Sequence, residues 1–475
     1  MLKRIGIALF MFLCILSVST ATVQAEGDVI ENSADGMPDA VLYKKILDIL
    51  GKHNGDKFTR QEAESIKKIS LQYDEKVQTF QGIEYCKNLT DLKALEISTE
   101  NLEEIALKVP NLERLSVCGN GRYFFENNSE ESRRQIDSLK ALENMKCLVS
   151  LDVSYNYLVS FEGIEGLENL ENFLAKGNQV SDAGELERLA KLGKLKQLDL
   201  SENQLKEIKG IGQLENLKIL YLRDNILEDL GEMSKLKNLI ALDINGNRIK
   251  KIDGIRNLVN LKYLWAEENC LTNISAVKYM KNLTELSVRG NMIKSFPTLK
   301  ALKKLEYLDA SDNELQSCPK IKKNKKLKKV SLSWNHLKKK DIKNSIPKKF
   351  WKEDKKIGPL WKSQKEILNF KFITPKNKSQ ITKNTNKIAG RASLKESVES
   401  VVFYIVLPEE KVNKRYCDKE SVHDMSYGKK KRKLKVTLSQ LDLKEYAGKE
   451  VKLVVIINER IKSNMFTVDR FVVKE

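Results

Sequence analysis

The sequence is poor in the residues on which most enzymes depend. Its 475 residues include only three histidines, His53, His336 and His423, and no paired metal ligands. The HExxH, GxSxG and phosphate-loop motifs are missing, which argues against zinc proteases, α/β-hydrolases and nucleotide hydrolases. Cys417 and His423 could supply a thiol and a base, but they lie in no protease motif. We therefore predict no enzyme, metal or cofactor site, with a hydrolase in the C-terminal region as the distant alternative.

Long hydrophobic runs are almost as scarce. Two basic residues precede one apolar run, from Ile5 to about Val18, and small residues follow it up to a cleavage site after Ala25. This arrangement is typical of a secretory signal peptide, residues 1–25. No later segment is long and apolar enough to span a membrane, and the C-terminus lacks the LPxTG motif of sortase anchoring. We expect secretion, with non-covalent retention at the cell surface.

What the sequence has in abundance is a repeat marked by asparagine. Segments of the form LxxLxLxxN end at asparagines 22 residues apart, at Asn203, Asn225, Asn247, Asn269, Asn291, Asn313 and Asn335. The series extends upstream to Asn178, Asn156 and Asn120 at intervals of 25, 22 and 36 residues, and Glu100 takes the equivalent place one step earlier. A period of this length predicts a solenoid, here of about eleven coils over residues 81–337.

One unit, residues 195–216, shows how such a coil folds. Leu198 and Leu200 alternate with Asp199 and Ser201, so a short strand points its leucines into the core and the other side chains outward. Asn203 follows the strand, and its amide can donate to and accept from backbone groups that the turn leaves unpaired. Apolar residues then recur every third position, which predicts a tight helical return or a run of turns on the convex side.

These repeats resemble the 22-residue leucine-rich repeats of the internalins and of the phosphatase 1 regulatory-subunit family. Upstream, Pro38 is expected to open a helix with an apolar stripe, and Thr59 with Glu62 forms a capping box for a second helix. The stripe consists of Leu42, Ile46, Ile49 and Leu50. This segment is similar to the helical N-terminal cap of internalin-like proteins of Gram-positive bacteria. We assign residues 26–80 to a linker and this cap, and export argues against the intracellular phosphatase regulators.

The positions of the cysteines do not indicate a disulfide framework. Cys14 lies in the signal peptide and follows Leu13, not the small residue that a lipoprotein anchor prefers. Cys86 and Cys318 occupy repeat positions that elsewhere hold isoleucine, so we expect them to be small buried hydrophobic residues. No spacing resembles a zinc site, and no two cysteines share a position in adjacent coils. We predict unpaired core thiols.

The repeats are followed by a change of period. Residues 338–362 resemble a helical C-terminal cap, in which four residues are expected to cover the last coil: Ile342, Ile346, Phe350 and Trp351. Over residues 363–475 the hydrophobic period becomes two, and six strands are predicted, enough for a β-sandwich. This part resembles immunoglobulin-like modules of bacterial surface proteins, with Tyr446 as a tyrosine corner. Fibronectin-like and cadherin-like sandwiches remain alternatives. The expected fold class is thus an α/β leucine-rich-repeat solenoid followed by an all-β sandwich.

An insertion of about 14 residues lies between Asn120 and Asn156. It ends in a segment with apolar residues at helical spacing after Ser129, which predicts a helix on the convex side. These apolar residues are Ile136, Leu139, Leu142 and Met145. The alternatives are a padded coil and a second docking surface.

Charge divides the chain sharply. Residues 26–317 carry a net charge of −8, whereas residues 318–475 carry +25. Such a lysine density exceeds what solubility requires, so we predict an anionic polymer as a partner, wall teichoic or lipoteichoic acid before nucleic acid. The candidate anion-binding residues are Lys325, Lys326, Lys328, Lys329, Lys338, Lys339, Lys340, Lys429, Lys430 and Lys431.

The outward strand positions are the candidate protein-binding surface, because in this repeat class they line the concave face. Aromatic residues have no structural need to point outward, yet several do so here, with arginines beside them. The candidate partner-binding residues are Tyr221, Arg223, Tyr263, Trp265, Glu267, Arg289 and Tyr307. A surface ladder between neighbouring coils is the structural alternative. We predict an exported, non-enzymatic module that binds a protein partner of unknown identity and an anionic envelope. The alternative is a carbohydrate-binding or envelope-maintenance protein without a host-protein partner.

Overall fold

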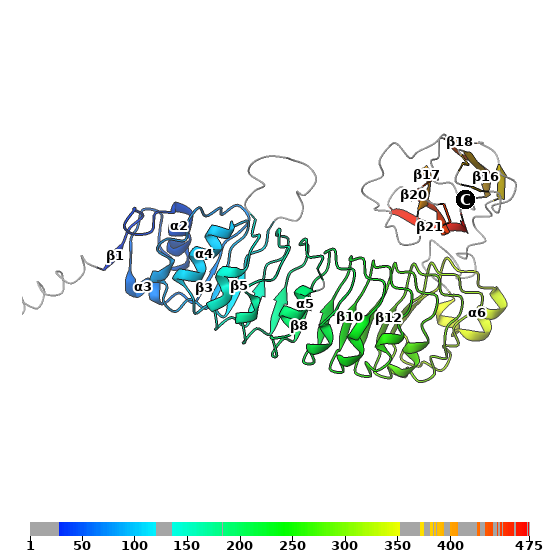
Figure 1. Cartoon of the computed structure of the whole chain (residues 1–475), viewed down its shortest axis with the longest axis horizontal. Helices are drawn as coiled ribbons and strands as arrows, with labels where there is room; N and C mark the ends of the chain where they lie inside the picture. Colours follow the sequence, from blue (N-terminus) through cyan, green and yellow to red (C-terminus); the bar gives the residue numbers. More distant parts are fainter. Residues whose placement is uncertain are drawn as a thin grey trace, which may run out of the picture. The chain divides into compact units, whose positions relative to one another are not determined.

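A computed structural model describes residues 28–119, 135–182 and 184–351, and, between 371 and 474, mainly the strands given below (Figure 1). The predicted signal peptide lies outside the described residues. The chain divides into two compact units. The first comprises Met1–Gln204 and Lys209–Leu217, and the second Leu205–Ile208 and Lys218–Glu475.

The described chain begins with a small strand and helix layer. Strands β1 (Val29–Ile30) and β2 (Phe58–Thr59) pair antiparallel, and α2 (Ala40–Ile49) and α3 (Arg60–Glu64) stand between β1 and the repeats in sequence. The capping box of Thr59 and Glu62 is confirmed, with reciprocal hydrogen bonds at the start of α3. Two details of the prediction were wrong. Asp39, not Pro38, caps α2, and Ile49 is 41% exposed while Tyr43 and Leu47 complete the buried face.

Twelve short parallel strands follow one another in a single sheet, in the order of the sequence. In the first unit these are β3 (Lys68–Ser70), β4 (Asp91–Lys93), β5 (Arg114–Ser116), β6 (Ser150–Asp152), β7 (Asn172–Leu174) and β8 (Gln197–Asp199). In the second unit they are β9 (Ile219–Tyr221), β10 (Ala241–Asp243), β11 (Tyr263–Trp265), β12 (Glu285–Ser287), β13 (Tyr307–Asp309) and β14 (Lys329–Ser331). The parallel sheet and the repeated coils confirm the predicted leucine-rich-repeat solenoid.

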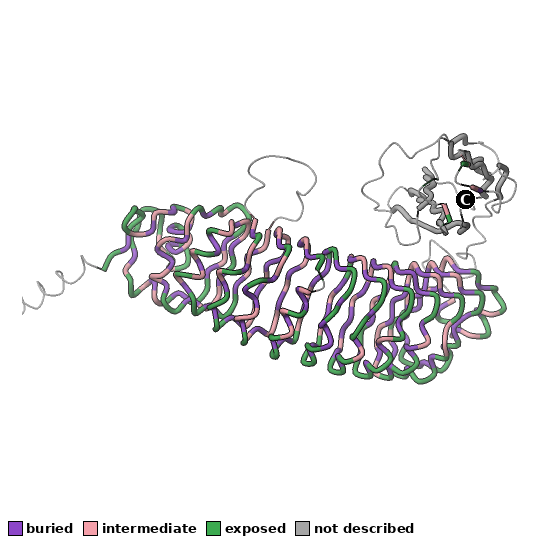
Figure 2. Tube along the Cα trace, viewed as in Figure 1, coloured by how far each residue is buried: buried purple, intermediate pink, exposed green. Residues whose placement is uncertain are grey.

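The predicted alternation of side chains is confirmed in every strand of the sheet. The central residue is buried, as with Leu220, Leu264 and Leu286. The flanking residues are more exposed, apart from Ala241 and Ser287, which are also buried. Figure 2 shows how buried segments recur along the coils. Successive coils therefore stack their leucines into one continuous core, which is why a single coil cannot fold alone.

Short helices return the chain on the side of the core opposite the sheet. Two are α-helical, α4 (Thr99–Lys108) and α5 (Gly184–Leu189). Seven are 3₁₀ turns: η1 (Ile83–Tyr85), η3 (Lys140–Asn144), η4 (Ile164–Gly166), η5 (Ile211–Gln213), η6 (Gly231–Lys235), η7 (Asp253–Ile255) and η8 (Ser275–Tyr279). In a 3₁₀ helix, residues three apart lie on the same side. Apolar residues at every third position of these turns therefore all face the core.

The repeat asparagines form a buried ladder, as predicted. Asn247 Oδ1 accepts the N–H of Leu227 one coil earlier at 3.0 Å, and its Nδ2 donates to the carbonyls of Leu222 at 2.9 Å and Ile244 at 3.1 Å. The same pattern recurs at Asn156, Asn178, Asn203, Asn269, Asn291, Asn313 and Asn335. Each amide thus joins two coils through their backbones.

A second series of asparagines, which the sequence analysis missed, lies on the surface before the strands. Each Nδ2 donates to one backbone carbonyl of the preceding coil, at 2.7 to 3.0 Å. The residues are Asn88, Asn169, Asn216, Asn260 and Asn282. They are partly or fully exposed, so water can replace these bonds.

The assignment of Glu100 to the ladder was wrong. Glu100 lies in the first turn of α4, and Glu96, with φ of 55°, has the left-handed backbone that elsewhere precedes the ladder asparagine. Ile97 therefore takes the ladder position and is buried in the core. The sheet also begins one coil earlier than predicted, at β3, within the segment assigned to the N-terminal cap.

The end of the insertion is not the predicted helix. Residues 120–134, including Ser129, lie outside the described residues, and from Gln135 the chain follows the ordinary coil. The Ile136 N–H donates to Asn156 Oδ1 at 3.0 Å, as Leu158 does to Asn178 one coil later. The four apolar residues are buried, but only η3 is helical. Their spacing of three comes from the coil, not from an amphipathic α-helix.

Downstream of β14, the chain turns into α6 (Lys339–Ser345) and η9 (Lys348–Phe350). Ile342, Ile346 and Phe350 are buried, as expected of residues that cover the last coil, and Trp351 is half-buried. The Ile321 N–H donates to the Ser345 carbonyl at 3.1 Å, which ties α6 to that coil.

Seven antiparallel strands are described beyond residue 370, one more than predicted. A four-stranded sheet has the order β15 (Lys371–Thr374), β16 (Lys387–Ser393), β19 (Lys433–Ser439) and β18 (Met425–Tyr427), and β18 is the strand that was missed. A three-stranded sheet has the order β17 (Ser400–Val406), β20 (Glu450–Glu459) and β21 (Lys462–Val472). The predicted tyrosine corner at Tyr446 lies outside the described residues, and the immunoglobulin-like assignment stays a prediction.

The cysteines of the described residues are all free thiols. Cys86, Cys270 and Cys318 are buried, which confirms the expected role of Cys86 and Cys318 as small hydrophobic residues. Burial raises the pKa of the Cys86 and Cys318 thiols to about 12, which keeps them protonated. Cys147 is exposed, so the prediction of core thiols fails at that position.

We expect Asn247→Ala to destabilise the protein by about 3 kcal/mol, because several buried backbone groups lose their partner at a cost of about 1 to 3 kcal/mol each. Asn260→Ala is the matched control, since its exposed amide supports one carbonyl and its loss should cost less than about 1 kcal/mol. Urea denaturation of both variants checks this. Equal losses would contradict the role given to the buried ladder.

Candidate partner-binding face

The outward side chains of the second unit form two regular rows across its strands. In the first row Tyr221, Asp243, Trp265, Ser287 and Asp309 are direct neighbours on β9 to β13. The second row holds Ile219, Ala241, Tyr263, Glu285, Tyr307 and Lys329. The predicted outward register is therefore confirmed, and the sheet brings together the candidate residues that come from separate coils.

Tyr263 and Trp265 form the aromatic centre of this face. Their rings stack at 5.7 Å between centroids with an angle of 14°. The Trp265 indole N–H donates to Glu285 Oε1 at 2.9 Å, which fixes the indole across β11 and β12. Tyr263 is 38% exposed and Tyr307 is 41% exposed. The stack and the indole bond hold these rings in place in the free protein, so little side-chain entropy would be lost on binding.

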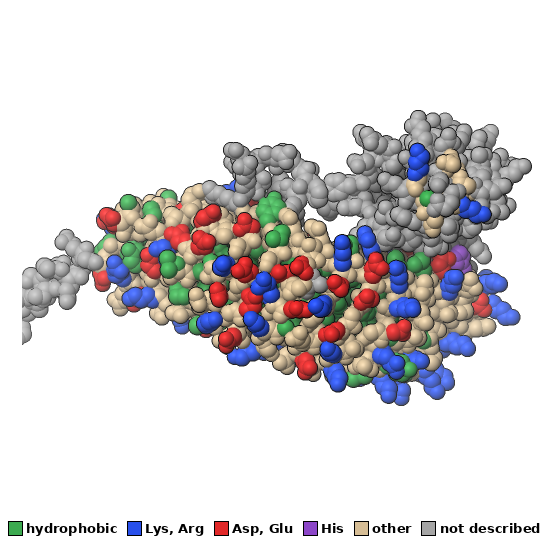
Figure 3. Space-filling model, viewed as in Figure 1, with side chains coloured by type: hydrophobic (Ala, Val, Ile, Leu, Met, Phe, Trp, Pro, Cys, Tyr) green, Lys and Arg blue, Asp and Glu red, His purple; other side chains and the backbone are tan. Residues whose placement is uncertain are grey.

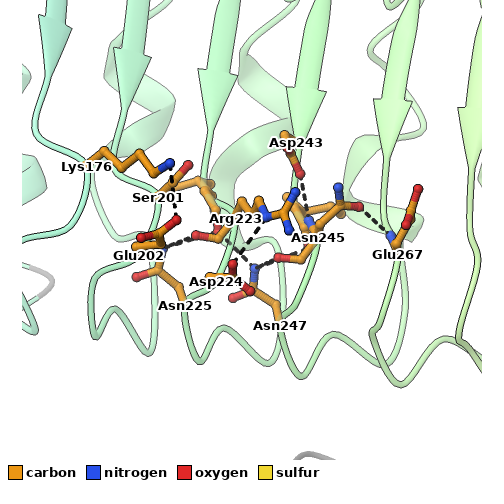
Figure 4. Close-up of polar contacts among 12 residues, drawn as sticks. Lys176, Ser201, Glu202, Arg223, Asp224, Asn225, Asp243, Asn245, Asn247 and Glu267 are labelled. Carbon is orange, nitrogen blue, oxygen red and sulfur yellow. Dashed lines mark hydrogen bonds and ion pairs between the residues drawn. The ribbon is translucent and has the colours of Figure 1, made fainter. Parts of the chain in front are cut away.

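The polar candidates surround these aromatic rings. Arg223 is exposed, and its Nε lies 3.2 Å from Asp224 Oδ2 (Figure 4). Glu267 accepts the Ser287 hydroxyl at 2.6 Å, and its N–H donates to Asn245 Oδ1 at 2.6 Å. Arg289 is half-buried on the following coil. The face therefore combines aromatic surface with charges of both signs.

Among the described residues of the second unit, Asp243 is the one acid whose pKa is strongly shifted. Burial raises the pKa of its carboxyl from 3.8 to about 6, although the Asn245 N–H and nearby Arg223 act in the opposite direction. The N–H of Asn245 donates to Asp243 Oδ1 at 2.9 Å. The sequence analysis did not select Asp243, because a lone aspartate in a repeat gives no sign of its burial.

The sheet face of the first unit has a different character. Here polar and charged side chains pair with one another: Arg114 with Asp91, and Lys176 with Glu202 at 3.1 Å. Burial raises the pKa of Asp199. The outward aromatic residues among the candidates all belong to the second unit, which therefore carries the candidate partner-binding surface.

The candidate anion-binding lysines that the structure describes are all exposed. Lys325, Lys326, Lys328 and Lys329 lie in the last coil, and the other three stand at the start of α6. Lys328 pairs with Glu306, which raises the lysine pKa. Figure 3 shows Lys and Arg side chains gathered over this end of the repeats. Lys429, Lys430 and Lys431 lie outside the described residues.

Within the described residues, no helix is long and apolar enough to cross a membrane. The same residues contain no group of three or more His, Cys, Asp or Glu side chains placed to hold a metal ion.

The repeats match a known family. Residues 193–238 and 237–279 each match the family described as leucine-rich repeats in two copies. No curated protein matches the chain in sequence. Together with the sheet and the asparagine ladder, this match identifies the repeats as leucine-rich repeats.

Several solved structures of leucine-rich-repeat proteins are similar to this chain. The internalin inlF from Listeria monocytogenes aligns over 63% of this chain and 91% of its own, with 26% identity and a TM-score of 0.54. Internalin C2 from the same organism aligns over 62% and 94%, with 21% identity and a TM-score of 0.37. A leucine-rich-repeat protein from Leptospira interrogans aligns over 58% and 86%, with 22% identity and a TM-score of 0.42. The first similarity, with the repeats, supports an internalin-like leucine-rich-repeat protein. Proteins of this kind are generally non-enzymatic and typically mediate protein–protein binding.

We expect Asp243→Asn to stabilise the protein at pH 7.5 by about 1 to 2 kcal/mol. A pKa shift corresponds to about 1.36 kcal/mol per unit, and the expected gain is smaller than the full conversion because solvent screens a carboxyl that is only partly buried. The folded state holds this proton more tightly than the unfolded chain. The favourable contribution is therefore complete below pH 3.8 and is lost as the pH rises through about 6.

Thermal denaturation at pH 7.5 and pH 3.5 checks this, with Glu207→Gln at an exposed site as the control. The advantage of Asp243→Asn should shrink at pH 3.5. An advantage of the same size at both pH values would show that ionisation of Asp243 is not its cause.

Proposed function

We propose that this protein is exported and binds a protein partner through the outward face of its second unit. The observation that carries the proposal is the stacked, partly exposed pair of Tyr263 and Trp265, with Tyr307 two strands away. Aromatic residues held rigidly on a surface are the side chains that dominate interface energies. The core of the coil does not need them, because Leu264 alone fills the core position of that strand.

Export rests on the N-terminal sequence. The apolar run and the small residues up to Ala25 fit a secretory signal peptide, and the similarity to an internalin fits a Gram-positive source. The helices α2 and α3 then serve as an N-terminal cap that shields the first coil, since solenoids need polar ends.

The basic C-terminal part is proposed to hold the protein at an anionic cell envelope. The last coil and α6 carry seven exposed candidate lysines, of which Lys328 pairs with Glu306. A dense group of exposed cations attracts an external polyanion. An immunoglobulin-like fold for residues 363–475 would add a compact basic module to the same end.

The protein-binding proposal predicts that Trp265→Ala together with Tyr263→Ala weakens partner binding by at least about 2 kcal/mol, the scale of interface hot spots. Immobilised protein would be used to recover the partner from host-cell and bacterial-envelope extracts. Affinity and melting temperature would then be measured on the same variants.

The matched control is Leu264→Ala on the same strand. This leucine is fully buried, so its truncation should cost on the order of 2 to 5 kcal/mol of stability. The double aromatic variant should keep its fold, because both rings leave the strand on the side away from the core. A double variant that keeps full affinity would refute the proposed binding face.

The envelope proposal predicts retention on bacterial cell walls that falls by at least about tenfold between 0.15 M and 1 M salt, because the screening length shrinks from about 8 to 3 Å. Replacing Lys325, Lys326, Lys338, Lys339 and Lys340 by glutamine should weaken retention at 0.15 M salt. The same number of substitutions at exposed lysines of the first unit is the control. Retention that is unchanged at 1 M salt would exclude the electrostatic mechanism.

A further inference from the structure

A half-buried carboxylate stands between aromatic side chains on the outward face of the second unit. Asp243 on β10 has Tyr221 of β9 as its direct neighbour on one side and Trp265 of β11 on the other. In the adjacent row, the small Ala241 lies between Ile219 and Tyr263. Ala241 is buried, whereas Asp243 keeps part of its exposure. We call the position above Asp243 the slot, with Tyr221 on one side and Trp265 as its aromatic wall on the other.

The spacing of the strands fixes the width of this slot. Neighbouring strands lie about 4.8 Å apart, so the backbones of β9 and β11 are ~10 Å apart. A group that reaches Asp243 between these strands therefore lies beside both Tyr221 and Trp265. Because the indole of Trp265 is held by Glu285, this wall is present before any ligand arrives.

Asp243 has no ion-pair partner in the described part of the chain. Its carboxylate accepts the N–H of Asn245 at 2.9 Å, but the nearest arginine, Arg223, pairs with Asp224 at 3.2 Å instead (Figure 4). A partly buried negative charge without a cation costs free energy. An external cation that reaches it would recover that cost, and the slot is where such a cation can approach.

We propose that this slot binds a basic side chain, in particular an arginine, presented by the protein partner. The proposal deepens the proposed function and rests on it. The guanidinium would pair with the Asp243 carboxylate while its flat face lies against the aromatic wall, an arrangement that combines charge pairing with a cation–π contact. Lysine fits less well, because its compact ammonium cannot stack on a ring.

Protonation of Asp243 turns the site off. The charged groups that face it are Arg223 and Asp224 from the coil of β9 and Glu267 from the coil of β11, and Tyr221 is the titratable group beside it. Burial raises the pKa of the Asp243 carboxyl to about 6, so this carboxylate gains a proton between pH 7.5 and pH 5. Binding of a cation should therefore weaken as the pH falls from 7.5 to 5.

The test uses the full chain and two small probes that differ in charge. N-acetyl-arginine methylamide carries the guanidinium, and N-acetyl-citrulline methylamide replaces it with a neutral urea of the same shape. Tryptophan fluorescence is the readout, and Trp265→Phe supplies the blank that isolates the Trp265 signal from the other three tryptophans. Each probe is titrated at pH 7.5 and at pH 5.

Two isosteric variants sharpen the result. Asp243→Asn removes the charge of the slot and keeps its volume. Asp309→Asn makes the same change in the same row, but Asp309 stands between Ser287 and Ser331 and has no aromatic walls. We expect the arginine probe to bind wild type and Asp309→Asn equally, to bind Asp243→Asn at least tenfold more weakly, and to bind wild type several-fold more weakly at pH 5. Melting temperatures confirm that both variants are folded.

Three outcomes would overturn the inference: equal binding of the citrulline probe, undiminished binding to Asp243→Asn, or no response of Trp265 to the arginine probe. The arginine slot and the binding face can fail separately in this test. A protein partner that is lost with Tyr263→Ala and Trp265→Ala, while Asp243→Asn binds both the partner and the arginine probe as wild type does, would leave the binding face intact and remove only the arginine slot.

Discussion

The repeats from Asn156 to Asn335 depend on one buried side chain in each coil, the asparagine after the strand. A coil of 22 residues leaves backbone N–H and C=O groups facing the core, where water cannot reach them, and each unpaired group costs about 1 to 3 kcal/mol. Asn247 pairs one N–H and up to three carbonyls on two coils. Leucine fills the core but cannot form these hydrogen bonds, whereas the asparagine amide both donates and accepts at the same point. Each coil therefore needs both features at once: leucines to fill the core and an asparagine to pair the backbone groups that face it.

The asparagine ladder also determines which outward residues become neighbours. Because the ladder holds each coil in the same phase, the outward residues of successive strands become direct neighbours, as Tyr221, Asp243 and Trp265 are. Residues 22 apart in sequence thus behave like one surface. A strand of three residues contributes only two outward side chains, so a binding face must be assembled from several coils. The backbone also has a cost: the residue before the asparagine is left-handed, and Glu202, Asp224 and Glu268 adopt this conformation without being glycine.

The features that follow the 22-residue period could be predicted from the sequence, and the predictions were wrong where a coil departs from that period. The strands, their inward leucines and the ladder from Asn156 to Asn335 follow from spacing alone. Glu100 was misplaced because Ile97 holds the ladder position in a coil whose return is the α-helix α4, so no asparagine marked the register. The segment after Ser129 was taken for a helix because a spacing of three suits both a helix and a coil. For the site, the sequence indicated which residues point outward, but not which rings stack or which acid is desolvated.

Asp243 shows why those two properties matter together. Stability alone favours a neutral residue at this position, since the carboxylate is half-buried and its pKa is raised to about 6. An asparagine would keep the hydrogen bond to Asn245 without a charge. Arg223 relieves this cost only in part, since it pairs with Asp224, and the acidic Glu267 adds to it. A charge that the fold tolerates but does not fully neutralise, beside an indole fixed by Glu285, is the feature on which the proposed arginine site rests.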